Sequence, residues 1–225
     1  MIDTLFGFIA PHSCYGCGEI GSVICDHCAN DITQEPFTRC IFCMKLTSRA
    51  AICARCTERY DLCSAWCIGE RRETLKSVLD AYKFERVRSA AESFARLMDE
   101  TIPVLDPDTV VTAIPTVPAH IRQRGYDHAE LAAKRFARLR GLPYRPLLER
   151  RDTHTQHTSS RQDRLRNAAQ AFKTRRVAEN VLLFDDIVTT GATVQAAAKE
   201  LKRAGAERIH VAIIARQPLD ETPYL

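Results

Sequence analysis

The sequence predicts an α/β domain with a mostly parallel sheet, preceded by a small cysteine-rich module. From residue 59 onward, apolar runs of strand length alternate with segments of helical periodicity, which is the pattern of parallel α/β folds. Before that point the chain holds eight of its ten cysteines, in regular pairs among polar and turn-forming residues. We therefore expect two units, a cysteine module over residues 1–58 and an α/β domain over residues 59–225.

Helices are expected where apolar residues recur at helical spacing, as at Leu75, Val78 and Leu79. This pattern covers residues 73–84, 89–101, 127–140 and 193–204. Asp127 is a suitable N-cap for the third helix, and a glycine follows both the third and the fourth. Strands are expected where apolar runs are bounded by turn residues, at 63–69, 109–115, 145–148, 180–185 and 208–215. The polar segment 150–166 shows neither pattern.

The composition is that of a globular protein, because 45% of the residues are hydrophobic and 27% are charged. No apolar run approaches the roughly 20 residues that a membrane-spanning helix needs, so we expect no membrane insertion. The apolar N-terminus, residues 1–11, lacks the basic residue that precedes the apolar run of a signal peptide. We expect it to form a short helix packed on a neighbour, and we expect a cytoplasmic protein.

The cysteines of the N-terminal module form four pairs with two residues between the partners. Each pair turns both sulfurs toward one point, and two pairs make a tetrahedral site that suits zinc and leaves no open position for water. The spacing therefore predicts two structural zinc ions held by Cys14, Cys17, Cys25, Cys28, Cys40, Cys43, Cys53 and Cys56. Grouping in sequence order is favoured because each loop is short, and a cross-braced grouping stays open. A disulfide scaffold is the alternative, which a reducing compartment disfavours.

The strongest functional signal lies near residue 185. The apolar run 181–184 leads into Asp185 and Asp186, and a hydroxyl-rich turn, 189–193, leads into a helix. Loop amides and a helix N-terminus bind phosphate, and Gly191 lets the backbone approach a ligand closely. Carboxylates accept hydrogen bonds from a sugar diol, so the segment suits a ribose 5-phosphate, with Mg²⁺ bridging the diol to a pyrophosphate. The alternative interpretation is a strand end with two acids and an ordinary threonine-rich cap.

This segment resembles the 5-phosphoribosyl 1-pyrophosphate loop of type I phosphoribosyltransferases, with its four apolar residues, two acids, two apolar residues and Thr-Thr-Gly-x-Thr. The preceding cysteine module, the stretch 122–128 (Arg-Gln-Arg-Gly-Tyr-Asp-His) and the pattern from Arg151 to Phe172 resemble the ComF/GntX family. The family usually has Asn in place of Asp127 and Leu near Ser159.

The resemblance implies a Rossmann-like type I phosphoribosyltransferase domain that binds 5-phosphoribosyl 1-pyrophosphate, or a related phosphosugar, with magnesium. It implies that Asp185 and Asp186 hold the ribose hydroxyls. The 5′-phosphate would lie among Thr189, Thr190, Gly191, Ala192 and Thr193.

Basic residues are expected around the same ligand. Arg122 and Arg124 follow the strand that ends near residue 115, and a guanidinium matches the geometry of a diphosphate. Arg161 and Arg164 could close over the ligand from the polar segment. Two other interpretations remain open, a solvated charged face and a track for single-stranded nucleic acid. Few aromatic residues accompany the basic ones, so base stacking has little support in the sequence.

Two functions of different classes follow from the resemblance. In the favoured one, the chain is an accessory factor in DNA uptake, with single-stranded DNA and the uptake machinery as partners. In the other, it is an active transferase that moves a phosphoribosyl group to an amine or a nucleobase, with Arg124 and magnesium stabilising the departing pyrophosphate. The first is favoured because no base-reading motif follows Asp185, and the cysteine module occupies the position of a base-binding hood.

Overall fold

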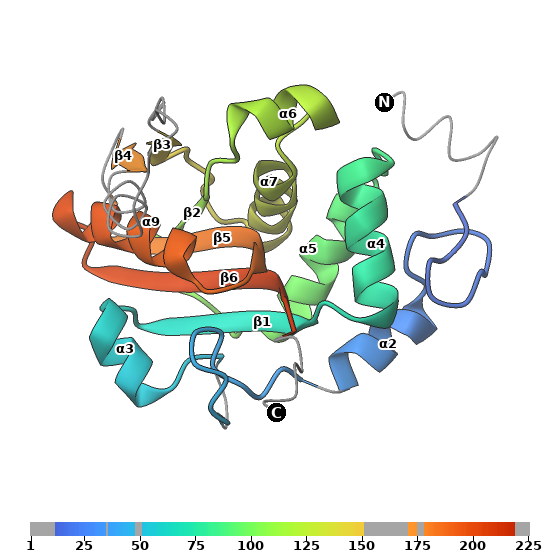
Figure 1. Ribbon diagram of the computed structural model, residues 1–225, viewed down its shortest axis with the longest axis horizontal. Helices are drawn as coiled ribbons and strands as arrows, with labels where there is room; N and C mark the ends of the chain where they lie inside the picture. The colour runs from blue at the N-terminus through green and yellow to red at the C-terminus, as the bar shows by residue number, and fades with distance from the viewer. Residues whose placement is uncertain (1–11, 35, 48–50, 151–170, 175–177, 219–225) are drawn as a thin grey trace, which may run out of the picture.

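A parallel sheet of four strands forms the centre of the chain, in the order β1-β6-β5-β2 (Figure 1). The structure is a computed structural model that describes residues 12–34, 36–47, 51–150, 171–174 and 178–218. The strands are β1 (Ser64–Glu70), β2 (Val110–Ala113), β5 (Asn180–Val188) and β6 (Arg208–Arg216). Every neighbouring pair is parallel, which confirms the predicted α/β class.

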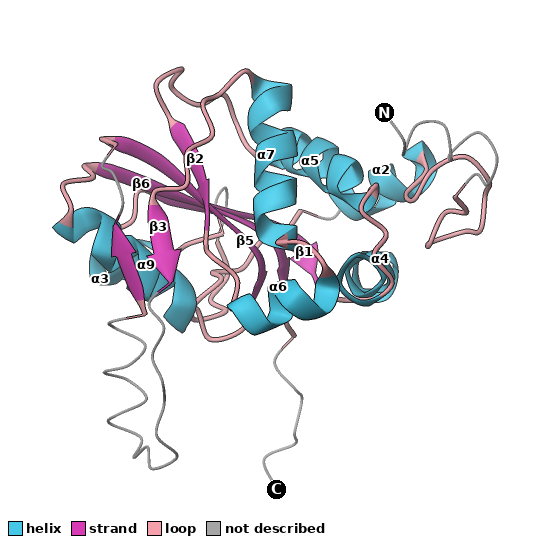
Figure 2. Cartoon of the chain, turned by 90° about the horizontal axis from the view of Figure 1, so that it is seen from above, coloured by secondary structure: helices cyan, strands magenta, loops and turns pink. Residues whose placement is uncertain are grey.

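Helices cover both faces of this sheet (Figure 2). Against one face lie α4 (Glu73–Phe84), α5 (Ala90–Thr101) and α7 (His128–Arg140), whose apolar side chains share a buried cluster with Leu182 and Phe184 of β5. Against the other lies α9 (Ala192–Arg203), which buries Val194 and Leu201 in a second cluster. The sheet is thus buried on both sides, which explains the continuous apolar runs of its central strands.

The strand β5 extends farther than predicted. Its end is Val188 instead of Asp185, because β6 continues beside it and pairs Arg216 with Val188. The predicted end of this strand was wrong, and the longer strand includes both acidic residues. Asp185 and Asp186 lie inside the strand near its carboxyl end, so their side chains point in alternating directions.

The predicted ends of the helices agree well with the structure. The helix α4 has the predicted bounds, and α5 begins directly after Ser89. Asp127 caps α7 by accepting a hydrogen bond from Glu130 N, and Gly141 ends it with a φ of 66°, where a residue with a side chain would be strained. The helix α9 begins at Ala192, one residue earlier than predicted.

The strand predicted at 145–148 was wrong. A short strand, β3 (Leu148–Arg150), lies farther along and pairs antiparallel with β4 (Phe172–Thr174) in a separate two-stranded sheet. Pro146 has no N–H to donate to a ladder, so residues before β3 make only an isolated bridge, between Tyr144 and Val111.

Three short helices were not predicted. They are α2 (Asp26–Gln34) and α3 (Ala54–Tyr60) beside the cysteine pairs, and α6 (Pro118–Arg124) after β2. Each is only two or three turns long, so it carries too few apolar residues for a clear period. The expected N-terminal helix and the polar segment from residue 151 lie outside the described residues.

The cysteine module packs on the α/β domain without a gap between their cores. Cys14, Val23 and Ile24 belong to the first buried cluster, and Cys40 and Ile41 belong to the second. Helix α3 runs across the proposed boundary at residue 58, so the division into two units stays a prediction. Among the described residues, no helix is both long and apolar enough to cross a membrane.

Candidate functional site

The cysteine pairs gather into two groups of four in sequence order. Within each group the sulfur atoms all lie within 4.8 Å of one another, as in Cys14, Cys17, Cys25 and Cys28, and in Cys40, Cys43, Cys53 and Cys56. This is the favoured grouping, and the cross-braced one does not occur among these cysteines. Each group can hold a metal ion, and four thiolates are the donor set that tetrahedral zinc prefers.

Backbone N–H groups lower the pKa of one cysteine of the first group, Cys14. Gly16 N and Cys25 N each donate to Cys14 Sγ at 3.4 Å. Burial raises the pKa of the Cys14 thiol, but these backbone hydrogen bonds outweigh burial and lower its pKa to about 6. The thiolate is therefore the form that the fold favours at this position, as a metal ligand requires.

Two cysteines outside the pattern, Cys63 and Cys67, fall in the strand predicted at 63–69. Cys67 is buried in β1, and burial raises its pKa to about 12. Cys63 is exposed and lies just before β1, which begins one residue later than predicted.

The candidate phosphate loop joins β5 to α9. Thr189 and Thr190 are exposed, Gly191 has a φ of 78°, and Ala192 starts the helix. The N-cap residue Gly191 has no side chain to cap α9, and Ala192 N donates to Thr190 Oγ1 at 3.4 Å. Backbone N–H groups at such a helix N-terminus are suited to binding an anion. The exposed side chain of Thr193 adds a hydroxyl to the same turn.

Asp186 is buried and paired with two basic side chains. Its Oδ2 lies 2.5 Å from Lys83 Nζ on α4 and 2.6 Å from His128 Nε2 on α7. Burial raises the pKa of Asp186, but His128 and the charge of Lys83 outweigh it, so the pKa is lowered. Asp186 is therefore a carboxylate that ties β5 to two helices, in addition to the ribose contact that the resemblance implies.

Asp185 faces the other side of the sheet, because neighbouring strand residues alternate. Leu183, on the same side, belongs to the cluster of α9, whereas Phe184 belongs to the cluster of α5 and α7. Burial, and then the charge of Asp186, raise the pKa of Asp185. The nearby charge of Asp185 acts in turn on Arg150, whose pKa burial lowers.

The arginines are placed unequally. Arg124 lies with its guanidinium 5.6 Å from the ring centre of Phe84 and its Nη1 3.2 Å from the ring nitrogens of His128. It thereby stands one side chain away from Asp186. Arg122 is exposed on α6. Arg161 and Arg164 lie outside the described residues.

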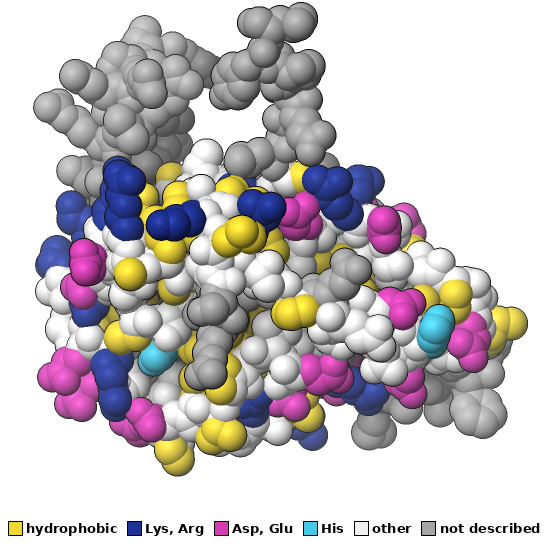
Figure 3. Space-filling view, turned by 90° about the horizontal axis from the view of Figure 1, so that it is seen from below, with side chains coloured by type: hydrophobic (Ala, Val, Ile, Leu, Met, Phe, Trp, Pro, Cys, Tyr) yellow, Lys and Arg dark blue, Asp and Glu magenta, His cyan; other side chains and the backbone are white. Residues whose placement is uncertain are grey.

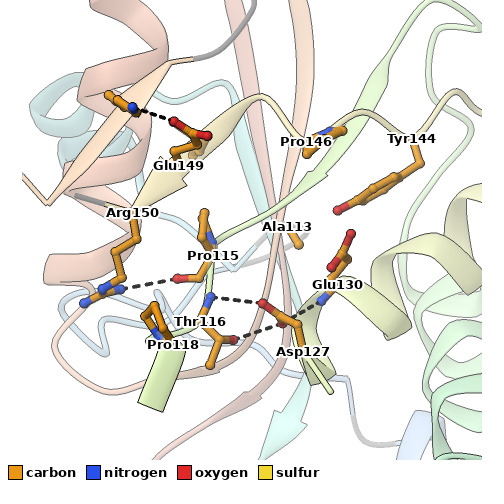
Figure 4. Close-up of a pocket in the computed structure, with 12 residues that line it drawn as sticks. Ala113, Pro115, Thr116, Pro118, Asp127, Glu130, Tyr144, Pro146, Glu149 and Arg150 are labelled. Atoms are coloured by element: carbon orange, nitrogen blue, oxygen red, sulfur yellow. Dashed lines mark hydrogen bonds and ion pairs between the residues drawn. The ribbon is translucent and has the colours of Figure 1, made fainter. Parts of the chain in front are cut away.

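A cavity of about 750 Å³ opens beside the loop after β2 (Figure 4). Asp127 holds this loop, because its carboxylate accepts hydrogen bonds from Thr116 N at 3.1 Å and Thr116 Oγ1 at 3.0 Å. Tyr144 and Glu130 point toward each other inside the cavity. Residues 189–193 are not among those that line it, so this cavity is separate from the candidate phosphate loop.

Asp127, where the related family usually has Asn, has a structural role in this chain. Its Oδ1 and Oδ2 together accept three hydrogen bonds, two from Thr116 and one from Glu130 N. An Asn offers only one acceptor oxygen, so both carboxylate oxygens are used here.

Sequence reasoning assigned no role to three residues at the site: Lys83, His128 and Arg150. Lys83 lies about a hundred positions from Asp186, and nothing in its helix marks it as inward-facing. His128 was accessible to inference, because it sits at the first helical position after the cap and four residues before the buried Ala132.

The comparisons with known proteins agree with this geometry. A family model described as "Phosphoribosyl transferase domain" matches residues 124–223. "Competence protein F" of Haemophilus influenzae is 27% identical over 224 residues, covering 85% of this chain and 96% of that protein. "Competence protein ComFC" of Streptococcus pneumoniae is 26% identical, covering 84% of this chain and 85% of that protein.

A third relative has a different name. "DNA utilization protein YhgH" of Escherichia coli is 26% identical over 209 residues, covering 86% of this chain and 90% of that protein. Each of the three alignments covers more than four fifths of this chain and of the relative. Over most of its length the chain is therefore similar to proteins named for competence and DNA utilization, and its residues 124–223 match the phosphoribosyltransferase domain.

Proposed function

We propose that the chain binds a 5-phosphoribosyl ligand of the 5-phosphoribosyl 1-pyrophosphate class at the carboxyl end of β5. The observation that carries the proposal is the loop from Val188 to Ala192, which joins a buried strand to the N-terminus of α9 through Gly191. The helix N-terminus and the hydroxyls of Thr190 and Thr193 would hold the 5′-phosphate.

The sugar and the diphosphate would lie on either side of this loop. Asp185 would accept hydrogen bonds from the ribose hydroxyls, with Asp186 behind it. Bound magnesium would neutralise diphosphate charge, and carboxylate oxygens are suitable partners for that ion. Arg124, which stands next to the Asp186 network, is the best-placed arginine for the diphosphate.

The cysteine groups would each hold a structural zinc ion, since closed four-thiolate sites leave no position for a reacting water. Thiolate sites of this kind persist in a reducing compartment, which supports a cytoplasmic location. The metal would replace the apolar core that so short a segment cannot build.

We propose further that the ligand site serves DNA uptake and the handling of single-stranded DNA. The names of the relatives support this role in preference to transfer of a base. On the face seen from below, basic, acidic and hydrophobic side chains are interspersed (Figure 3). Among the described residues of this face, several Lys and Arg side chains lie near its upper edge, separated by other side chains, so any DNA contact by them would depend on a few residues.

Calorimetric titration with 5-phosphoribosyl 1-pyrophosphate and magnesium tests the ligand. The wild-type chain should bind, and Thr193→Val should weaken binding by about tenfold, the value of one lost hydrogen bond to a charged group. Asp185→Asn should weaken binding as well. Thr33→Val, on α2, is the matched control and should bind like the wild type. Equal affinity for all four proteins would place the ligand elsewhere.

Fluorescence anisotropy with labelled single-stranded DNA tests the second part. Binding should weaken as salt is raised from 50 to 200 mM, because phosphate contacts release counterions. A duplex of the same sequence is the control. Absence of binding to the single strand, with and without the phosphoribosyl ligand, would remove DNA from the list of partners.

A further inference from the structure

We propose that the second cysteine group, Cys40 to Cys56, forms part of the wall of the phosphate loop, and that Phe42 and Arg216 are positioning residues for this loop. A metal ion in the second group would then control the affinity for the phosphoribosyl ligand, whereas a metal ion in the first group would not. This inference rests on the proposed phosphoribosyl site.

The first observation is a direct contact between a cysteine turn and the loop. Phe42 lies between Cys40 and Cys43, and its ring fills the space beside the Cα atom of Gly191. A Cβ atom at position 191 would overlap the ring atoms Cδ1 and Cε1 of Phe42. The ring is backed by Tyr60, with ring centres 4.5 Å apart. The cysteine turn therefore limits where the backbone of the loop can lie.

The second observation is a buried cation that joins the same turn to the start of the loop. Arg216, only 2% exposed, donates from Nε to Ile41 O at 2.9 Å and from Nη1 to Val188 O at 3.4 Å. Its Nη1 also donates to Gln217 O, and Gln217 N donates to Val188 O at 2.9 Å. One guanidinium thus fixes both the cysteine turn and the last residue of β5.

The first cysteine group is built in the same way but packs elsewhere. In both groups an antiparallel bridge closes the first turn, between Ser13 and Ile20 and between Arg39 and Leu46. The first turn contacts α4, because a Cβ at Gly16 would meet the side chain of Thr74. The first group therefore serves as a control for the second, because it has the same construction but does not share the contact with Gly191.

The physical consequence concerns the N–H groups of the loop. They bind an anion only while the backbone holds them in one direction, and a four-thiolate site holds its turn only while the metal is bound. Loss of the second metal would release Ile41 and Phe42 together, and the loop would lose contacts on two sides. Small displacements of binding groups have large effects on ligands that need several of them at once.

The experiment compares Cys43→Ser with Cys17→Ser in the full chain. Both cysteines are the exposed ligand of their group, so the two variants should each lose about one metal ion and a similar amount of stability. Cys43→Ser should weaken the binding of 5-phosphoribosyl 1-pyrophosphate by roughly 10- to 100-fold. The affinity of Cys17→Ser for this ligand should be within a factor of two of the wild-type affinity. Such a difference is no larger than the effect, on the order of 0.5 kcal/mol, by which distant substitutions depart from additivity.

Amide hydrogen exchange gives a second readout that needs no ligand. The amides of residues 188–193 should exchange faster in Cys43→Ser than in the wild type, and should be unchanged in Cys17→Ser. If the wild type binds no phosphoribosyl ligand but this difference appears, the proposed function fails and the structural coupling stands. If Cys43→Ser loses its metal and both readouts match those of Cys17→Ser, the inference is overturned.

Phe42→Ala separates the contact from the metal. The Phe42→Ala variant should keep two metal ions but bind the ligand more weakly than the wild type. The Phe42→Leu variant should have most of the wild-type affinity, because leucine restores apolar bulk against Gly191. Gly191→Ala should be less destabilising in the Phe42→Ala background than in the wild type, since the steric overlap is gone and only the strain at positive φ remains. Strict additivity of the two changes would contradict the contact.

Discussion

At the scale of single residues, the buried carboxylate of Asp186 joins the central strand β5 to two helices. This carboxylate lies between Lys83 of α4 and His128 of α7, and it leaves Asp185 as the more accessible acid of the pair. A buried carboxylate is stabilised only while its partners, here Lys83 and His128, remain beside it. The pair of acids therefore divides into one residue that holds the fold and one that is free for a ligand.

Replacement of Lys83 tests this division. Lys83→Ala should lower the free energy of unfolding by about 3 kcal/mol, the lower end of the range for one lost partner of a buried ion pair, since His128 remains. Lys76→Ala, on the same helix, is the matched control. Lys76 is 53% exposed and pairs with Asp80, so its loss should cost at most about 1 kcal/mol. Urea denaturation of the two variants measures both values.

The same carboxylate makes stability depend on pH. The pKa of Asp186 is lower in the folded chain than the value of about 3.9 that an unfolded Asp has, so its stabilising contribution is present above pH 4 and disappears as the pH falls. Asp186→Asn should therefore be less stable than the wild type at pH 7, and this difference should shrink below pH 4. Urea denaturation of both proteins at several pH values gives the difference in their free energies of unfolding. The effects of pH on groups that both proteins share cancel in this difference.

At the scale of elements, the helix after the phosphate loop is tied to the strand that follows the polar segment. Glu200 of α9 accepts hydrogen bonds from Thr174 N and Thr174 Oγ1 of β4, both at 3.0 Å, and pairs with Arg203. The hydrogen bond from Arg203, and then those from Thr174, lower the pKa of Glu200 to about 2 against the effect of burial.

This contact predicts how β4 is anchored. Glu200→Ala should destabilise the chain by about 2 kcal/mol, because Thr174 loses charge-assisted hydrogen bonds. Trypsin should then cut after Lys173 of β4 faster than in the wild type. Glu207→Ala is the control, because Glu207 is an exposed residue just before β6. Unchanged cleavage in Glu200→Ala would mean that β4 is held by its pairing with β3 alone.

Elements with a clear period could be predicted from the sequence, and those defined by distant partners could not. The bounds of α4 and the Asp127 cap of α7 follow from local rules of spacing and capping. The end of β5 depends on where β6 stops, and the position of β3 depends on β4, more than twenty residues away. The contact between Asp186 and Lys83 depends on the packing of α4 on the sheet, which no local pattern encodes.

At the scale of the whole molecule, the cysteine module and the α/β domain share their cores. Removal of both metal ions with a strong chelator should therefore lower the melting temperature of the entire chain in a single transition, instead of unfolding a separate N-terminal unit. Differential scanning calorimetry checks this, with added zinc as the reversal control. Two resolved transitions, one of them insensitive to the chelator, would show that the units are independent.

One contact of the second cysteine group has a consequence for behaviour in a crowded cell. Ala51 N donates to Ala65 O at 2.7 Å, so Ala51 lies beside β1, which is an outer strand of the sheet. The interior of β1, from Ala65 to Ile68, is apolar and buried. Uncovered outer strands of this composition pair with other chains. Loss of a metal ion from the second group should therefore uncover β1 and favour self-association, to an extent that rises with the concentration of the protein.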